Sequence, residues 1–211
     1  MKCWTRRQFI EAAAAGMAAS PLIASGMTST AKSDPRPIVY WTPEISEAAL
    51  IRMVNLVKGE LTGKIALKLH TGEPKGPNIL PPAWIKTLQG TIPESTIVEC
   101  NVLYKSPRQT TAGHRKVLEE NGWTFSKVDI MDEFGDAPLP IKGGLHLKEI
   151  MVGKHFFDYD SMLVLTHFKG HGMGGFGGSL KNIAIGCASA EHGKKQVHNV
   201  QSDGSWPRGA G

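Results

Sequence analysis

The chain has 211 residues, of which 41% are hydrophobic and 20% are charged, and its formal net charge is +5. This composition is that of a globular protein with room for one domain of ordinary size, and it excludes a low-complexity chain. The first 31 residues hold three basic residues and one acidic residue, so the rest of the chain carries a net charge of +3. That small excess, without a basic run among aromatic residues, argues against nucleic acid as a partner.

The first residues have the plan of an export signal. A charged start precedes an apolar, alanine-rich segment over residues 10–24, and small residues follow. Residues 5–10, Thr-Arg-Arg-Gln-Phe-Ile, resemble the twin-arginine motif. We therefore predict a twin-arginine signal over residues 1–31, the export machinery as a partner and a periplasmic location; an amphipathic N-terminal helix is the alternative. The apolar segment is shorter than a membrane span of about 20 residues, so no stable span is expected.

From residue 32 to residue 211 we predict a single domain in which strands alternate with helices. Strand patterns, short and apolar, occur at residues 38–41, 64–70, 96–101, 125–130 and 162–167. Helices are predicted over residues 42–57, 81–88 and 110–121, and a further one begins at Ser179. The first of these helices is expected to bury Ala48, Ile51 and Leu56. Residues 145–158 are predicted to form a hairpin that turns at Gly153 and Lys154.

This alternation predicts an α/β fold with a mostly parallel central sheet flanked by helices. We expect residues 65–69, 97–100 and 162–165 to be central parallel strands of one sheet. Ligands of such sheets bind beyond the carboxyl ends of the strands. Polar residues follow those ends here: His70, Glu73, Lys75, Asn101, Lys105, Arg108 and residues 167–171. Residues 204–211 have the composition of an open loop, so we expect a C-terminally truncated fragment.

The segment over residues 161–199 carries the strongest functional signal. Six glycines occur within nine positions, at 170, 172, 174, 175, 177 and 178. Each glycine costs chain entropy, and folding alone does not require so many. We therefore expect the backbone of this loop to approach a ligand closely. The side chains next to the loop are those of His167, Lys169, His171, Lys181 and Asn182.

One candidate for this site is a nucleotide. Gly172-x-Gly174-x-x-Gly177 follows a strand and precedes a helix, and Glu191 lies further on, as in the dinucleotide fingerprint. So many glycines produce this spacing easily, and the loop follows the fifth strand rather than the first. No Gly-Lys-Ser or Gly-Lys-Thr sequence is present, which excludes a Walker loop.

A second candidate is a transition metal or a metal-containing cofactor. The predicted ligands are His167, His171, His198 and Cys187, with His192 close by in the sequence. The alternative role for each histidine is to cap a loop by bonding to backbone carbonyls. Cys187 could instead form a disulfide with Cys100, the other cysteine beyond the leader.

A third candidate, compatible with either of the others, is a basic cradle for a small anionic molecule. Its cations are Lys68, Lys75, Arg108, Lys169 and Lys181. Lysine and arginine make strong charge-assisted hydrogen bonds with carboxylates and phosphates. The alternative is that these side chains form an ordinary solvated surface.

Several motifs resemble the domain-of-unknown-function family numbered 362 over about residues 38–200. They are residues 64–74, 101–104 and 153–156, and above all residues 165–182, Leu-Thr-His-Phe-Lys-Gly-His-Gly-Met-Gly-Gly-Phe-Gly-Gly-Ser-Leu-Lys-Asn. Members often carry a ferredoxin-like cysteine cluster and are then labelled iron–sulfur proteins. This chain has no such cluster.

The loop is also similar, more distantly, to that of the nickel-pincer lactate racemases. His171 and Lys181 lie ten residues apart with Gly-Phe and Gly-Gly between them. In that family the lysine tethers the cofactor, and a histidine some sixteen residues later binds nickel. His198 lies seventeen residues after Lys181, and Leu180 replaces the arginine that precedes the lysine in the racemases.

These features together predict an exported α/β protein that binds a metal or cofactor through the glycine-rich loop. The expected cofactor-binding residues are Lys169, Gly174, Gly175, Gly177, Gly178 and Lys181. If the protein is an enzyme, we expect proton or hydride chemistry on a small anionic substrate, with His171 and Lys181 as catalytic residues. The competing function is that of a non-catalytic carrier or a nucleotide-binding protein.

Overall fold

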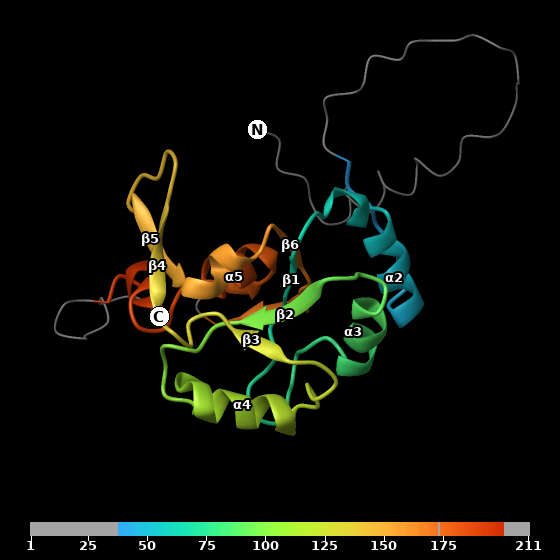
Figure 1. Cartoon of the computed structure of the whole chain (residues 1–211), viewed down its shortest axis with the longest axis horizontal. Coiled ribbons are helices and arrows are strands. Elements are labelled where there is room, and N and C mark those ends of the chain that lie inside the picture. The colour runs from blue at the N-terminus through green and yellow to red at the C-terminus, as the bar shows by residue number, and fades with distance from the viewer. Residues whose placement is uncertain (1–37, 173, 201–211) are drawn as a thin grey trace, which may run out of the picture. The chain divides into compact units, whose positions relative to one another are not determined.

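The computed structural model describes residues 38–172 and 174–200, and its centre is a four-stranded parallel sheet (Figure 1). The strand order is β3-β2-β1-β6. The bounds are β1 Ile65–Lys68, β2 Ser95–Glu99, β3 Val128–Ile130 and β6 Ser161–Val164. Ile65 of β1 is in register with Ser95 of β2 and with Ser161 of β6. The α/β fold and the placement of the three predicted strands in one parallel sheet are therefore confirmed, but β6 is an edge strand of the described sheet rather than a central one.

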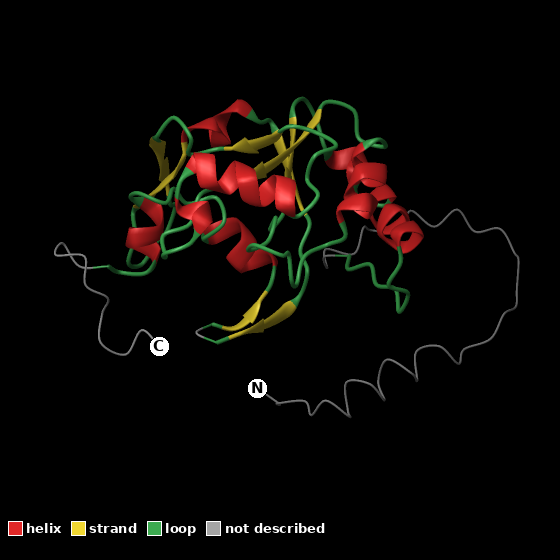
Figure 2. Ribbon diagram, turned by 90° about the horizontal axis from the view of Figure 1, so that it is seen from below, coloured by secondary structure: helices red, strands yellow, loops and turns green. Residues whose placement is uncertain are grey.

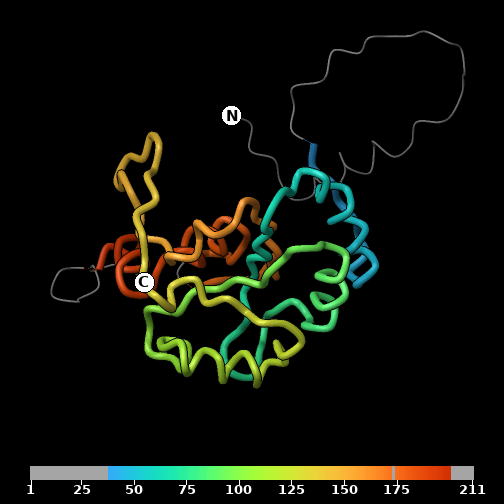
Figure 3. Tube along the Cα trace, viewed as in Figure 1, coloured from blue at the N-terminus to red at the C-terminus, as the bar shows by residue number. Residues whose placement is uncertain are grey.

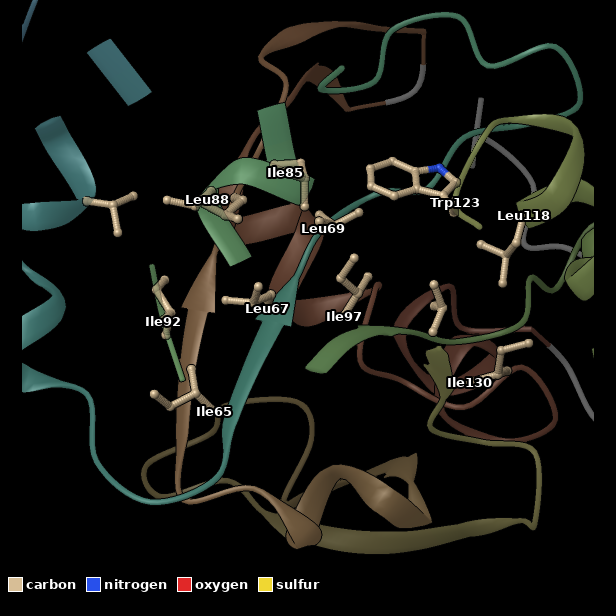
Figure 4. Packing of buried hydrophobic residues seen from close by; sticks show 13 residues of the cluster. Ile65, Leu67, Leu69, Ile85, Leu88, Ile92, Ile97, Leu118, Trp123 and Ile130 are labelled. Carbon is tan, nitrogen blue, oxygen red and sulfur yellow. The ribbon is translucent and has the colours of Figure 1, made fainter. Parts of the chain in front are cut away.

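Both faces of β1 are covered, which explains its nearly continuous apolar sequence. Ile65, Leu67 and Leu69 enter the larger core cluster on one face (Figure 4). Ala66, on the other face, belongs to a second cluster with Val98 of β2 and both cysteines. The next residue of β1 on that second face is Lys68. The strand therefore buries a charged side chain on the same face as Ala66.

Three helices contribute to the larger core: α2 Glu47–Asn55, α3 Pro82–Gln89 and α4 Thr111–Glu120. The hydroxyl of Thr110 caps α4 by accepting the backbone N–H of Gly113. The hydroxyl of Ser46 caps α2, so the predicted start of this helix at residue 42 was wrong. Its buried residues are Ala49 and Val54 rather than Ala48 and Leu56. Single 3₁₀ turns lie at Lys58–Glu60, Pro107–Gln109 and Lys154–Asp158.

Two further expectations were wrong. Residues 38–41 form no strand, and most of their side chains are exposed, so no burial of apolar surface stabilises an extended conformation there. The hairpin consists of β4 Asp136–Pro140 and β5 Glu149–Gly153, joined by residues 141–148. Gly153 ends β5 instead of forming the turn. A Cβ atom there would lie 2.6 Å from the backbone carbon of Met131, so this glycine serves close packing.

The glycine-rich segment forms a two-stranded antiparallel ribbon, β7 Lys169–His171 with β8 Gly175–Gly177. It is the pair of arrows at the lower edge of Figure 2. Helices α5 Ser179–Ala184 and α6 Gly193–Val197 follow it. Figure 3 shows this last part of the chain, coloured orange to red, beside the strands of the sheet. No helix within the described residues is long and apolar enough to cross a membrane.

Candidate functional site

A cavity of about 580 Å³ lies where the ribbon, α5 and α6 meet the carboxyl ends of β1, β2 and β6. We call it the strand-end cavity. Its volume is that of a typical small-molecule site, and its place is the one expected for a parallel α/β sheet. Six of the predicted site residues line it: Lys169, His171, Gly177, Gly178, Lys181 and His198. His70, Glu73 and Arg108, predicted from the loops after β1 and β2, line it as well.

The other residues of the predicted site do not line this cavity. Gly174 and Gly175 are at the far end of the ribbon, and Gly175 has a φ of 73°, as the tight reversal requires. His167 and Cys187 do not line the cavity. The glycines of the ribbon therefore do not form the strand-to-helix turn of a dinucleotide fingerprint.

At the end of β2, the wall of the cavity includes Glu99, which forms a buried ion pair with Lys68. The Nζ of Lys68 donates three hydrogen bonds, to the carbonyl of Leu69 at 2.8 Å, to Oε1 of Glu99 at 2.9 Å and to Oδ1 of Asn182 at 2.8 Å. An ammonium has three N–H groups, so the bonding capacity of Lys68 is filled. Burial would raise the pKa of Glu99, but Lys68, His70 and Arg108 outweigh it and hold that pKa well below its usual range.

Arg108 extends this network to the rim of the cavity. Its Nη2 donates to Oε2 of Glu99 at 3.2 Å and its Nη1 to Oε1 of Glu73 at 2.7 Å. Its Nε donates to Nε2 of His114 at 3.2 Å, while Nδ1 of His114 donates to Oδ1 of Asn101 at 3.1 Å. These bonds select the neutral, Nδ1-protonated ring. Burial, reinforced by the charge of Arg108, lowers the pKa of His114 to about 4.

Three lysines of the cavity have no carboxylate partner within the described residues: Lys169, Lys181 and Lys194. Burial and the charge of Lys181 lower the pKa of Lys169, and burial lowers the pKa of Lys181. Burial likewise lowers the pKa of Lys194, which is 5% exposed. Each lowered pKa reflects a positive charge that is incompletely compensated.

His171 is a neighbour of two of these lysines, Lys169 and Lys181. Burial, followed by the charges of Lys181 and Lys169, lowers the pKa of His171. Its Nδ1 accepts the backbone N–H of Gly174 at 3.0 Å. In the neutral ring the proton therefore resides on Nε2, and His171 is oriented by the reversal of its own ribbon.

A second, more open hollow of about 590 Å³ lies beside β5 and α6, and its one carboxylate already has hydrogen-bond donors. Asp136 accepts hydrogen bonds from the hydroxyl of Ser189 at 2.6 Å and from the imidazole of His192 at 2.8 Å. The strand-end cavity, with its uncompensated lysines, is the stronger candidate for a ligand site.

The family of domains of unknown function designated DUF362 matches residues 65–205, which include the sheet, the ribbon and every residue of the cavity. The chain belongs to this family. No curated protein and no solved structure matches the chain. The similarity of the loop to the nickel-pincer racemases stays a prediction.

The metal centre predicted for this DUF362 domain also stays a prediction. Among residues 38–172 and 174–200, no group of three or more His, Cys, Asp or Glu side chains could hold a metal ion. Cys100 and Cys187 are free and buried, and burial raises the pKa of both thiols, whereas a metal ligand is a thiolate. Nδ1 of His167 is buried without a hydrogen-bond partner in the described structure. The described side chains thus do not assemble a protein-only metal site.

Sequence reasoning missed two charged residues of the DUF362 cavity, Glu99 and Lys194. A signal for the first was present. Lys68 and Glu99 are charged residues within otherwise apolar strands, and two opposite charges in neighbouring buried strands suggest a pair. Lys194 gave no such signal, because Lys-Lys in a polar segment is typical of a solvated surface.

Proposed function

We propose that the strand-end cavity binds a small anionic molecule and that Lys169 and Lys181 neutralise its charge. One observation carries the proposal. The cations Lys68 and Arg108 are balanced by Glu99 and Glu73, whereas the lysines that remain have no carboxylate partner in the described part of the chain. A carboxylate or phosphate in the cavity would compensate them through charge-assisted hydrogen bonds.

The local geometry favours a ligand beside the ribbon. Within the described residues the Nζ of Lys169 donates one hydrogen bond, to the carbonyl of Asn78 at 3.2 Å, and so retains donors for an anion. The missing side chain of Gly177 leaves room beside Lys169, because a Cβ atom at position 177 would lie 3.5 Å from Cγ of Lys169. Gly177 and Lys169 are both among the residues predicted from the sequence to bind a cofactor.

We also propose Lys181 and His171 as proton-transfer groups if the ligand is a substrate. A lysine with a lowered pKa gives up its proton more readily than a solvated one, which suits a general base. The Gly174 N–H occupies Nδ1 of His171, so the neutral ring offers an N–H through Nε2. His171 is thereby suited to donate a hydrogen bond to the ligand; to donate a proton the ring would first have to become imidazolium, which its lowered pKa disfavours. A carrier would bind the anion through the same groups without turnover.

Isothermal titration of the purified chain with malonate and with inorganic phosphate tests the anion site. We expect binding that weakens as salt rises. Lys181→Met is expected to weaken it roughly ten- to a hundred-fold, the loss of one charged hydrogen bond. Lys195→Met, which removes an exposed lysine outside the cavity, is the matched control and should bind like the parent. Equal binding by the two variants would overturn the proposal.

The export signal, the periplasmic location and the export machinery as a partner lie outside the described residues and are likewise proposals. They rest on the arginine pair and the apolar segment at the start of the chain.

A further inference from the structure

Two lysines of the domain are almost completely buried, and their surroundings differ. Lys68 is 0% exposed and its ammonium has three acceptors, one of them a carboxylate. Lys194 is 5% exposed, and in the described part of the chain its Nζ has one acceptor, the carbonyl of Ala188. Two N–H groups of Lys194 are therefore available, although a buried ammonium normally has its hydrogen bonds filled.

The position of Lys194 gives those two donors a target. Lys194 lies on α6 and lines the strand-end cavity together with Cys100, which is also buried. It thus forms the floor of the cavity, while the less buried Lys169 and Lys181 lie nearer to solvent. Burial raises the pKa of the Cys100 thiol, so this neighbour is uncharged. Asp132 and Glu99 offset part of the effect of burial on the pKa of Lys194, but neither carboxylate forms an ion pair with it in the described part of the chain.

His198 connects the floor with the outer lysines. It lies one helical turn after Lys194, and its backbone N–H donates to the carbonyl of Lys194 at 3.0 Å. Burial, then the charges of Lys181 and Lys194, lower the pKa of His198. A row of basic groups therefore runs from the ribbon to the floor.

Apolar side chains form part of the wall of the cavity. They are Val102 and Leu103, from the segment after β2, and Ile185, at the end of α5. A ligand that fits this surface has a carbon body between its charged ends.

We propose that the ligand carries two anionic groups joined by a short carbon chain, with one group at Lys169 and Lys181 and the other at Lys194 on the floor. This inference rests on the proposed anion site and specifies its substrate class, small dicarboxylates or carboxylates that bear a phosphate. The assignment makes Lys194 a residue that determines specificity.

Pairs of acids of equal length test the proposal on the parent chain alone. Titrations compare butyrate with succinate and valerate with glutarate at constant ionic strength. We expect the dianion to bind roughly tenfold or more tightly, the contribution of one charged hydrogen bond. 3-Phosphonopropionate, which has the chain length of succinate and a phosphonate at one end, identifies the preferred group. Equal affinities for monoanions and dianions would overturn the dianion proposal while leaving the anion site intact.

Variants locate the second group. Lys194→Met, close to lysine in volume, should remove the advantage of succinate while butyrate loses much less affinity. Lys181→Met should weaken the binding of both acids, whereas Lys195→Met should change the affinity for neither. If the thermal melt shows that Lys194→Met is unfolded, Lys194→Arg replaces it and should preserve the preference for succinate. A folded Lys194→Met that keeps the full preference rules out Lys194, and a parent that binds no acid refutes the anion site itself.

Discussion

The ammonium of Lys68, in the central strand β1, lies 2.8 Å from the side-chain oxygen of Asn182 in α5, 114 positions later in the chain. Nδ2 of Asn182 donates in turn to the carbonyl of Leu165 at 3.2 Å and to Oγ1 of Thr166 at 3.0 Å. One amide therefore joins the sheet, the end of β6 and α5. Lys181, which lines the cavity, directly precedes Asn182 in α5. Its position therefore depends on the hydrogen bond between Asn182 and the buried Lys68.

Replacement of Lys68 by methionine should destabilise the domain by about 3–5 kcal/mol, because it leaves the carboxylate of Glu99 buried with fewer partners. The double variant with Glu99→Gln should lose less than the sum of the two single losses, because no isolated charge remains. Urea unfolding of the four proteins measures the coupling. Strictly additive losses would mean that the pair acts as two independent groups.

His114 makes stability depend on pH in a defined window. Its pKa is lowered to about 4 in the folded protein, so between pH 6.5 and 4 the unfolded chain binds the extra proton. This contribution is complete above pH 6.5 and is lost as the pH falls, by roughly 3 kcal/mol for a shift of this size. In His114→Gln, which keeps a neutral donor and acceptor, the loss attributable to this position is absent. Unfolding at pH 7 and pH 4.5 should therefore show a smaller decrease for the variant than for the parent.

Gly177→Val tests the ribbon as a ligand site. The backbone at Gly177 has no left-handed φ, and its Cβ would make ordinary contact with Lys169, so the fold should tolerate the change. The two valine methyl groups would displace the Lys169 side chain, and we expect malonate affinity to fall at least tenfold. Gly170→Val is the control, because a Cβ there meets nothing within 4 Å and position 170 lies outside the cavity. Similar malonate affinity in the two variants would remove Gly177 from the site.

The leader is testable by itself. A fusion of residues 1–35 to a folded reporter should reach the periplasm, and the double change Arg6→Lys, Arg7→Lys should retain the reporter in the cytoplasm. Fractionation and reporter fluorescence measure the distribution. Secretion that survives the double change would mean that another route, or no signal of this type, is present.

The sequence was sufficient for the sheet because buried parallel strands leave short apolar runs, such as residues 65–67 and 97–98. It was also sufficient to collect Lys169, His171 and Lys181 at one cavity, since loops after parallel strands meet at one edge. The sequence was not sufficient where one residue type can have either of two structural roles. Gly153 serves close packing rather than a turn, and burial of Lys194 depends on contacts that no local pattern encodes.

The space beside Lys68 also constrains how this chain can diverge. A Cβ atom at Gly186 would lie 2.0 Å from the carbonyl oxygen of Asn182 and 2.8 Å from the ammonium of Lys68, so no larger residue is expected at position 186. An apolar residue at position 68 would remove one hydrogen-bond donor from the buried carboxylate of Glu99 and one from Oδ1 of Asn182. A sequence in which only one of these residues has been replaced is thus expected to fold less stably than one with all of them or none. In related sequences, positions 68, 99 and 182 should therefore covary, either retained together or replaced together.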